Sequence, residues 1–440
     1  MQAARKLSSI RLGNMEVKII SKETIKPSSP TPDHLRTHKL SLLDQIEIGE
    51  SIYIPVILFY SVAPGDSGKI SNILKESLSK TLTHFYPFAG RVKDSFSIDC
   101  NDEGVIYIEA QVAIDMSIVV KEPEIDLLLP LLPSDSLERL SDPTAQVLAV
   151  IQVNFFACGG MAICACVDHV VADGAAAATF IKSWAEIACG ANYINGDVIY
   201  DCTSVFPPQD LSGFWELIAN EYINEAPKPQ GKVVTKKLLF DGSKITALRN
   251  EIGNGPGTYR PSRFEAVSAL IWYAMLSTTT KNDKTFSTVT VSMNLRNKTN
   301  PPLPQQCIGN VYQVVESPMK KTINLSSLAG KIHETIRKVD DDYVKKLGAG
   351  DAYLNIIRSK VKNQKFLFSS WCRFPFYEAD FGWGKPIWFG TALRINRAVI
   401  FLDTRDGEGI EAWITLTQEE MAKFEQDPGI LAYSFSKVSI

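Results

Sequence analysis

The longest apolar stretch of the chain, from about Val147 to Val171, constrains the fold more than any other feature. Polar residues and a pair of glycines interrupt it, namely Gln152, Asn154, Gly159, Gly160 and Asp168. A membrane-spanning helix needs about 20 predominantly apolar residues in a row, so the pattern does not indicate one. It predicts two buried strands joined at 158–160, followed directly by a helix over 175–188.

The same kinds of element continue along both halves of the chain. Before residue 205, strand patterns at 52–60 and 105–109 alternate with a helical pattern at 70–84. The second half shows helical patterns at 263–275 and 325–346, and strand patterns at 288–293, 387–389, 398–402 and 411–415. Strands and helices mixed in both halves predict an α/β or mixed α+β fold.

The length of 440 residues is more than one ordinary domain of about 100–200 residues needs, so we expect two domains. The proline-rich and charged sequence from about Phe206 to Lys237 is typical of a solvated crossover. We therefore predict an N-terminal domain at 1–205, a linker at 206–237 and a C-terminal domain at 238–440.

Charge and targeting signals limit the partners and the compartment. A formal net charge of -3 gives no electrostatic reason to expect nucleic acid or an anionic membrane as a partner. The N-terminal region lacks the apolar core of a signal peptide, and translation could begin at Met1 or at Met15. We expect a cytoplasmic protein with reduced cysteines and no membrane insertion. Cys164 and Cys166 point to one face of a strand, and we interpret them as packing residues, so no metal is expected.

His169 follows the second predicted strand and is the candidate for the chemistry. The sequence reads Asp168-His169-Val-Val-Ala-Asp173-Gly174, so the histidine lies at a strand-to-helix junction, where it can meet a reactant that the strand excludes. An imidazole can take a proton from an alcohol near neutral pH, which is typically worth about 100- to 10,000-fold in rate. The alternative is a histidine that only packs and forms hydrogen bonds.

Several motifs along nearly the whole chain resemble those of the plant BAHD acyltransferases. They are His169-x-x-x-Asp173, Asp380-Phe381-Gly382-Trp383-Gly384, Leu40-Ser-Leu-Leu-Asp44-Gln45, His84-Phe-Tyr-Pro-Phe-Ala-Gly-Arg91 and Val291-Ser-Met-Asn-Leu-Arg296. The chain looks closest to the branch that contains vinorine synthase and salutaridinol acetyltransferase. The resemblance implies two similarly folded domains related to chloramphenicol acetyltransferase, with an active-site channel between them.

The resemblance also implies roles for the motif residues. Asp173 would turn away from His169 and pair with Arg296. The alternative is that Asp173, four residues from His169, orients the ring as an aspartate does in a hydrolase triad. Asp380 and the loop of Phe381, Gly382, Trp383 and Gly384 would be structural, with Asp380 held by a cation.

Ser369 and Trp371 lie shortly before this loop. In related hydroxycinnamoyltransferases a hydroxyl residue and a tryptophan at these offsets face the reacting carbonyl. A hydroxyl or an indole N–H there would donate to the developing oxyanion, which is worth about 3 kcal/mol for one donor in well-studied enzymes. A tryptophan that merely packs is the alternative.

The implied function is an acyl-CoA-dependent O-acyltransferase that esterifies a hydroxyl of an alkaloid or terpenoid alcohol, with acetyl as the expected acyl group. His169 would take the hydroxyl proton while the oxygen attacks the thioester directly. Acyl-CoA is then a co-substrate, no cofactor is permanently bound, and a monomer is expected. A hydrolase that uses the same base on water and a non-catalytic ligand-binding homologue are the alternatives.

Overall fold

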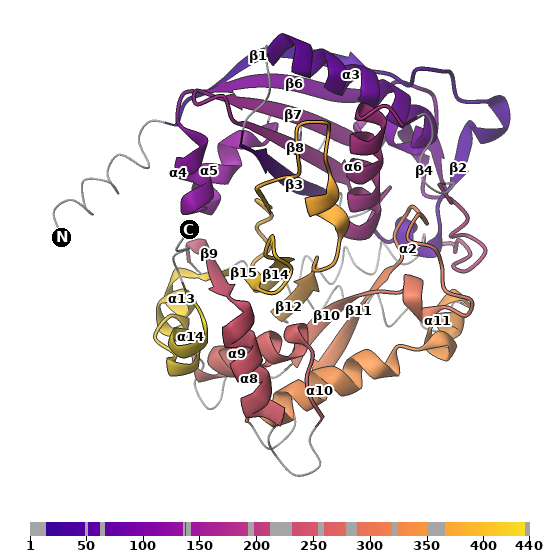
Figure 1. Ribbon diagram of the computed structural model, residues 1–440. Coiled ribbons are helices and arrows are strands. Elements are labelled where there is room, and N and C mark those ends of the chain that lie inside the picture. Colours follow the sequence, from indigo (N-terminus) through magenta and orange to yellow (C-terminus); the bar gives the residue numbers. More distant parts are fainter. Residues whose placement is uncertain are drawn as a thin grey trace. The chain divides into compact units, whose positions relative to one another are not determined.

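A computed structural model of the chain describes residues 15–48, 52–61, 67–134, 137, 142–191, 198–211, 231–253, 259–278, 288–318, 324–349 and 366–435. The chain forms two compact units, coloured along the sequence in Figure 1. The first consists of Met1–Pro208, Pro304–Val311 and Phe374–Leu393, and the second of Gln209–Leu303, Tyr312–Arg373 and Arg394–Ile440. Each unit contains a six-stranded sheet, which confirms the predicted mixed α/β class with two sheet-containing domains.

The two units are not continuous halves of the chain, whereas the sequence division at 205 and 238 treats them as continuous. Pro304–Val311 and Phe374–Leu393 come from the C-terminal half but belong to the first unit. Within the predicted linker, 212–230 lies outside the described residues. Strand β9 (Val233–Phe240) begins inside the predicted linker. Its residue Lys237 is buried and pairs with Glu411 at 3.4 Å.

The sheet of the first unit has the strand order β1-β6-β7-β8-β3-β13. The strands are β1 (Val17–Ile25), β6 (Val105–Val112), β7 (Ala149–Phe156), β8 (Met161–Asp168), β3 (Tyr53–Tyr60) and β13 (Trp388–Gly390). Neighbours are antiparallel except β6 and β7. Every residue of β3 and β8 is buried, and the turn between β7 and β8 lies at the predicted glycine pair. A small sheet of β2 (Thr37–Lys39), β5 (Ser97–Asp99) and β4 (Arg91–Asp94) completes the strands described in this unit.

Two long helices accompany this sheet (Figure 1), and they confirm the helical patterns at 70–84 and 175–188. They are α3 (Ser67–His84) and α6 (Gly174–Ala188), and the unit also contains the shorter α2 (Leu42–Gln45), α4 (Met116–Lys121) and α5 (Ile125–Leu128). Four consecutive alanines at 175–178 favour the helical conformation of α6. The buried Trp184 of α6 donates its indole N–H to the carbonyl of Leu74 in α3 at 3.2 Å, which fixes the two helices to each other.

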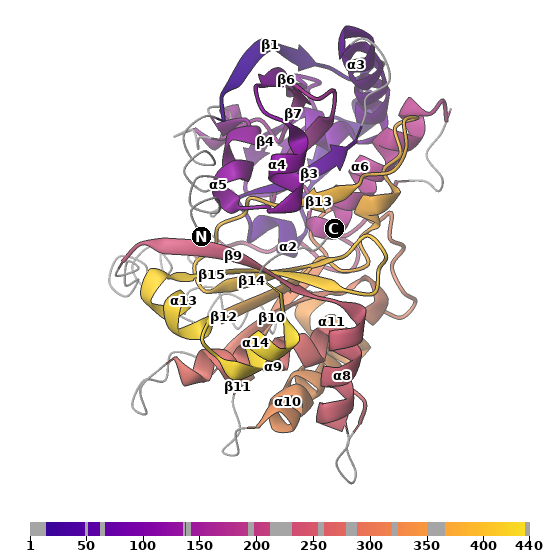
Figure 2. The same cartoon turned by 60° about the vertical axis from the view of Figure 1, so that its left-hand side comes forward.

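The second unit has the strand order β11-β10-β12-β14-β15-β9. Its further strands are β11 (Tyr312–Pro318), β10 (Thr288–Asn294), β12 (Phe366–Ser370), β14 (Ala398–Asp403) and β15 (Ile410–Thr417). Strand β12 is parallel to both of its neighbours, and the other pairs are antiparallel. Figure 2 shows helices on one side of this sheet, among them α8 (Gly242–Gly253), α9 (Arg263–Ser277), α10 (Leu325–Lys338) and α14 (Pro428–Tyr433).

The single helix expected at 325–346 is wrong, because two helices occupy this range. Helix α10 ends at Lys338, and α11 (Asp341–Gly348) begins after Asp340. Val339 between them has an extended backbone, with φ -88° and ψ 92°. The Asp340 side chain accepts the N–H of Tyr343 as the N-cap of α11, and an aspartate in this role favours the start of a new helix.

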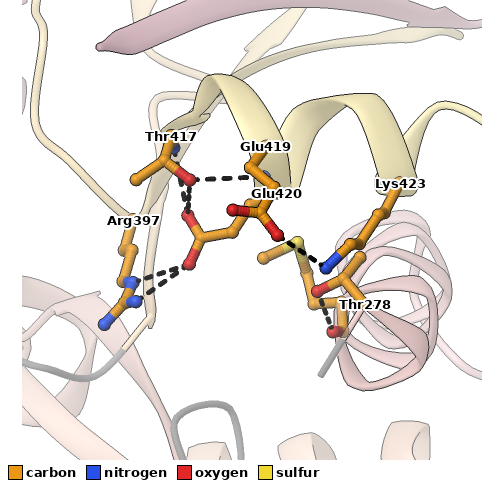
Figure 3. Close-up of polar contacts among 7 residues, drawn as sticks. Thr278, Arg397, Thr417, Glu419, Glu420 and Lys423 are labelled. Atoms are coloured by element: carbon orange, nitrogen blue, oxygen red, sulfur yellow. Dashed lines mark hydrogen bonds and ion pairs between the residues drawn. The ribbon is translucent and has the colours of Figure 1, made fainter. Parts of the chain in front are cut away.

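The N-terminus of helix α13 (Gln418–Phe424) shows how a short helix is fixed (Figure 3). Thr417 and Glu420 form a reciprocal capping box, in which Glu420 accepts the Thr417 N–H at 3.0 Å. The other oxygen of Glu420 accepts from the Arg397 guanidinium at 2.9 Å. One carboxylate therefore satisfies a helix-end donor and joins α13 to the residue that precedes β14.

Candidate active site

His169 lies where β8 ends and before α6 begins. Strands β3 and β8 pair so that Tyr53 is opposite Asp168, and the His169 N–H donates to the Ile52 carbonyl at 2.9 Å. Asp168 accepts the Val170 N–H at 3.0 Å, which supports the turn that follows. The His169 side chain is 19% exposed. The backbone of the histidine is thus fixed by the sheet while part of its ring is accessible.

The His169 ring contacts a residue distant in sequence. Its Nδ1 lies 2.8 Å from the side-chain oxygen of Asn310. The Asn310 side-chain nitrogen in turn donates to the His169 carbonyl at 2.6 Å. A carboxylate oxygen of the buried Glu47 lies 3.9 Å from the same ring nitrogen.

Asp44 holds Asn310 from its other side. One carboxylate oxygen of Asp44 accepts from the backbone N–H of Asn310 at 2.7 Å and from its side-chain nitrogen at 2.9 Å. The other oxygen accepts from the backbone and hydroxyl of Ser41 at 2.9 Å and 2.6 Å. Burial raises the pKa of Asp44 above its ordinary value, and the hydrogen bonds from Ser41 and Asn310 act in the opposite direction.

Asp173 connects the start of α6 to the same distant segment. It is the N-cap of α6, where one oxygen accepts the Ala176 N–H at 2.8 Å and Gly174 is the first helical residue. Its other oxygen accepts the Val311 N–H at 3.0 Å. These bonds give Asp173 a structural task, since one carboxylate caps a helix and holds the residue next to Asn310.

The segment Pro304–Val311 is fixed to the first unit by its backbone as well. Ile308 donates to the Ile199 carbonyl at 2.8 Å, and Ile199 donates to the Gln306 carbonyl at 3.1 Å. Gly309 has a positive φ of 111°, and a Cβ at this position would lie 3.2 Å from an oxygen of Asp44. A glycine there allows the chain to turn so close to the carboxylate.

The loop 380–384 also belongs to the first unit and is organised by its own backbone. Asp380 accepts the N–H groups of Gly382 and Gly384 at 2.8 Å and 2.9 Å, and both glycines have φ 100°. Phe381 is buried and stacks on Trp383 with ring centroids 5.7 Å apart. The Asp380 carboxylate thus accepts two backbone amides of its own loop, and the cation partner and the structural role implied for this loop stay predictions.

Three further predicted residues lie in the second unit. Ser369 is in β12, opposite Ser292 of β10. The buried Trp371 follows that strand and donates its backbone N–H to the Phe401 carbonyl at 2.8 Å. Arg296 is fully buried after β10, and its backbone N–H donates to the side chain of Asn294 at 3.0 Å. The contact of Ser369 and Trp371 with the reacting carbonyl stays a prediction. The pairing of Arg296 with Asp173 also stays a prediction.

Asn310, Asp44 and Glu47 were not predicted as site residues. Asp44 belongs to the 40–45 motif on which the family resemblance partly rests, but that motif carried no role. Asn310 follows Gly309 in a stretch without any pattern that points to chemistry. Only the pairing of distant segments in the fold brings it to His169.

The described residues were searched for clusters of metal-ligating side chains and for membrane-spanning helices. Among them, no three His, Cys, Asp or Glu side chains gather in a way that could hold a metal ion. Cys164 and Cys166 are buried with their sulfurs 3.7 Å apart. In the same part of the chain, no helix combines the length and the apolar character that crossing a membrane requires.

The sequence and fold are similar to those of known proteins. The Transferase family matches residues 15–431. The epi-neemfruitin B synthase of Melia azedarach is 47% identical over 97% of this chain and 100% of its own length. The limonoid 1-O-acetyltransferase of Citrus sinensis is 43% identical, again over 97% and 100%.

Among solved structures, vinorine synthase has the same fold. Its TM-score is 0.79 and its sequence identity 33%, and the match covers 96% of this chain and 99% of that chain. Both the family match and the two relatives extend over nearly the whole sequence. The chain therefore belongs to the transferase family of plant BAHD acyltransferases, and it is an acyltransferase.

Proposed function

We propose that this enzyme transfers an acetyl group from acetyl-CoA to a hydroxyl of an oxygenated terpenoid of the limonoid class, with His169 as the general base. The acceptor class is supported by the Citrus sinensis relative, which is named as a limonoid 1-O-acetyltransferase. A coenzyme A thioester is the donor expected for this family. The base is supported by the accessible ring of His169 at the end of a buried strand.

The proposed reaction is a single displacement. His169 Nε2 takes the proton of the acceptor hydroxyl while that oxygen attacks the thioester carbonyl carbon. The tetrahedral intermediate collapses by breaking the carbon–sulfur bond, and the imidazolium returns the proton to the departing thiolate. The products are the acetyl ester and coenzyme A, and the imidazole is neutral again.

The observation that carries the proposal is the 2.8 Å contact between His169 Nδ1 and Asn310. This contact occupies one ring nitrogen, which supports proton transfer at the other. Ser369 or Trp371 would stabilise the oxyanion, and Arg296 would pair with Asp173, as the family resemblance implies. We also propose a monomeric state and a cytoplasmic location, as the sequence led us to expect.

The test is an acetyl-transfer assay with purified protein, acetyl-CoA and a panel of limonoid and alkaloid alcohols. Ester should form only when donor and acceptor are both present. His169→Ala should lower kcat by about 100-fold or more, the usual worth of a general base. His333→Ala is the matched control, because His333 also hydrogen-bonds through Nδ1, to Glu265 at 2.8 Å, but in the second unit.

Other outcomes identify the alternatives. Release of free acetate from acetyl-CoA without an acceptor would indicate a hydrolase. Binding of coenzyme A without turnover on any alcohol would favour a non-catalytic homologue. Wild-type turnover by a folded His169→Ala variant would remove the base from the proposal.

A further inference from the structure

We propose that Asn310 and Asp44 are positioning residues that hold His169 in the tautomer with the proton on Nδ1. In this tautomer the lone pair is on Nε2, where the acceptor hydroxyl would meet it. The inference rests on the proposed function of His169 as a base. It adds two residues from distant parts of the sequence that act through the histidine.

The orientation of the Asn310 side-chain amide follows from its partners. The amide nitrogen lies 2.9 Å from a carboxylate oxygen of Asp44 and 2.6 Å from the His169 carbonyl oxygen. Both neighbours are acceptors, so the amide group that faces them must be the NH₂ donor. The flipped orientation would place the amide oxygen against two oxygens and leave it without a donor from either.

The amide orientation determines the proton position on His169. With the nitrogen turned toward Asp44, the Asn310 oxygen faces His169 Nδ1 at 2.8 Å. An amide oxygen can only accept, so Nδ1 must carry the hydrogen. A neutral imidazole has one N–H, and Nε2 is then the basic nitrogen.

The orientation of the Asn310 amide does not depend on whether Asp44 is protonated. The oxygen that faces Asn310 accepts two N–H bonds, while the other oxygen lies 2.6 Å from the Ser41 hydroxyl. A proton on the Ser41 side would leave the oxygen toward Asn310 an acceptor. The raised pKa of the buried Asp44 therefore does not disturb the arrangement.

The arrangement differs from a hydrolase triad in what touches the ring. In a triad a carboxylate accepts the Nδ1–H directly. Here a neutral amide accepts it, and the Asp44 carboxylate is one residue further away. We expect the amide to fix the ring and its tautomer, whereas the carboxylate fixes the amide.

The test measures the tautomer without any substrate. The chain has five histidines, so the imidazole nitrogen spectrum of ¹⁵N-histidine-labelled protein is simple, and a His169→Gln variant assigns the signal. In the wild type, the neutral His169 ring should show a protonated Nδ1 and a bare Nε2. In Asn310→Ala the signal should move toward the Nε2–H tautomer, with kcat about 10- to 100-fold lower and the KM for acetyl-CoA within about twofold.

Asn154→Ala is the matched control. Asn154 is also fully buried in the first unit and donates its side-chain N–H to the Leu131 carbonyl at 3.0 Å. This variant should lose stability without changing the His169 tautomer. A merely structural role of Asn310 would make the two variants alike.

Asp44→Asn and Asp44→Ala test the more distant residue. Asp44→Asn retains an acceptor oxygen and should keep more of the Nδ1–H signal than Asp44→Ala. Adding Asp44→Ala to Asn310→Ala should lower kcat little further, because both act through one contact. If Asp44→Ala does not fold, the comparison of Asp44→Asn with Asn310→Ala decides.

Failure of the positioning role and failure of the proposed function look different. An Nε2–H tautomer in the wild type, or Asn310→Ala with unchanged spectrum and kcat, overturns the positioning role even if ester forms. Absence of ester with every acceptor overturns the proposed function, while the tautomer result remains valid.

Discussion

Removing the Asp173 carboxylate should loosen two separate segments at once. In Asp173→Ala the N–H groups of Ala176 and Val311 lose their acceptor, and both residues are fully buried. Loss of an N-cap costs about 0.5–2 kcal/mol. A buried N–H left without a partner costs about 1–3 kcal/mol more. We expect a local destabilisation of about 1.5–5 kcal/mol in total.

Hydrogen exchange measured by mass spectrometry reports this change locally. Peptides that cover 304–311 and the first turn of α6 should exchange roughly 10- to 4,000-fold faster, since each 1.4 kcal/mol is tenfold. Asp427→Ala is the control, because Asp427 also caps a helix with two N–H bonds, but in the second unit. It should leave both peptides unchanged.

Unchanged exchange in the 304–311 peptide would refute the reasoning, because the bond to Val311 would then contribute nothing. If both peptides kept their protection while turnover was lost, Asp173 would instead have the catalytic role of an aspartate in a triad.

Three further outcomes are expected. Burial lowers the pKa of His38 to about 4 from 6.5. The unfolded state therefore binds the proton more tightly than the folded state does. The free energy of unfolding should fall by up to about 3 kcal/mol as the pH drops from 6.5 toward 4. Urea unfolding at several pH values should show this slope for the wild type and a flatter one for His38→Gln. Glu420→Ala should cost about 1–2 kcal/mol through the lost capping box and the contact with Arg397, and Glu420→Gln less, as seen in thermal unfolding. Incubation with acetyl-CoA alone should leave the protein mass unchanged, whereas a stoichiometric acetyl adduct that transfers to the acceptor would contradict direct attack.

Local patterns predicted much of the fold. Strands β7 and β8 and helix α6 were found because apolar runs, a glycine pair and an alanine run are short-range signals. Strand β9 was missed, because Lys236 and Lys237 give it the composition of a linker. Lys237 is buried, and its ion-pair partner Glu411 lies in β15. A partner strand more than 170 positions away leaves no mark on the local sequence.

The candidate site also contains residues that local patterns predicted and residues that they could not predict. His169 was predicted because its strand, its turn and its motif are adjacent in the chain. Asn310 is 141 positions from His169, and Asp44 is 266 positions from Asn310. Neither contact has a spacing that could be recognised from one sequence. Their roles depend on how the segment Pro304–Val311 returns to the first unit.

The first unit contains segments from the C-terminal half of the chain, and this has a consequence for synthesis on the ribosome. His169 and its strand are made early, but Asn310 and strand β13 emerge only after much of the second unit has been translated. At about 5–20 residues per second, roughly 15–65 s separate the synthesis of β3 from that of β13. During this interval the apolar strand β3 lacks its neighbour at Ile57–Phe59, and an unpaired strand edge favours aggregation. The nascent chain should therefore depend on chaperones until its last 50 or so residues are made, and the enzyme acquires its organised histidine only after Asn310 has been made.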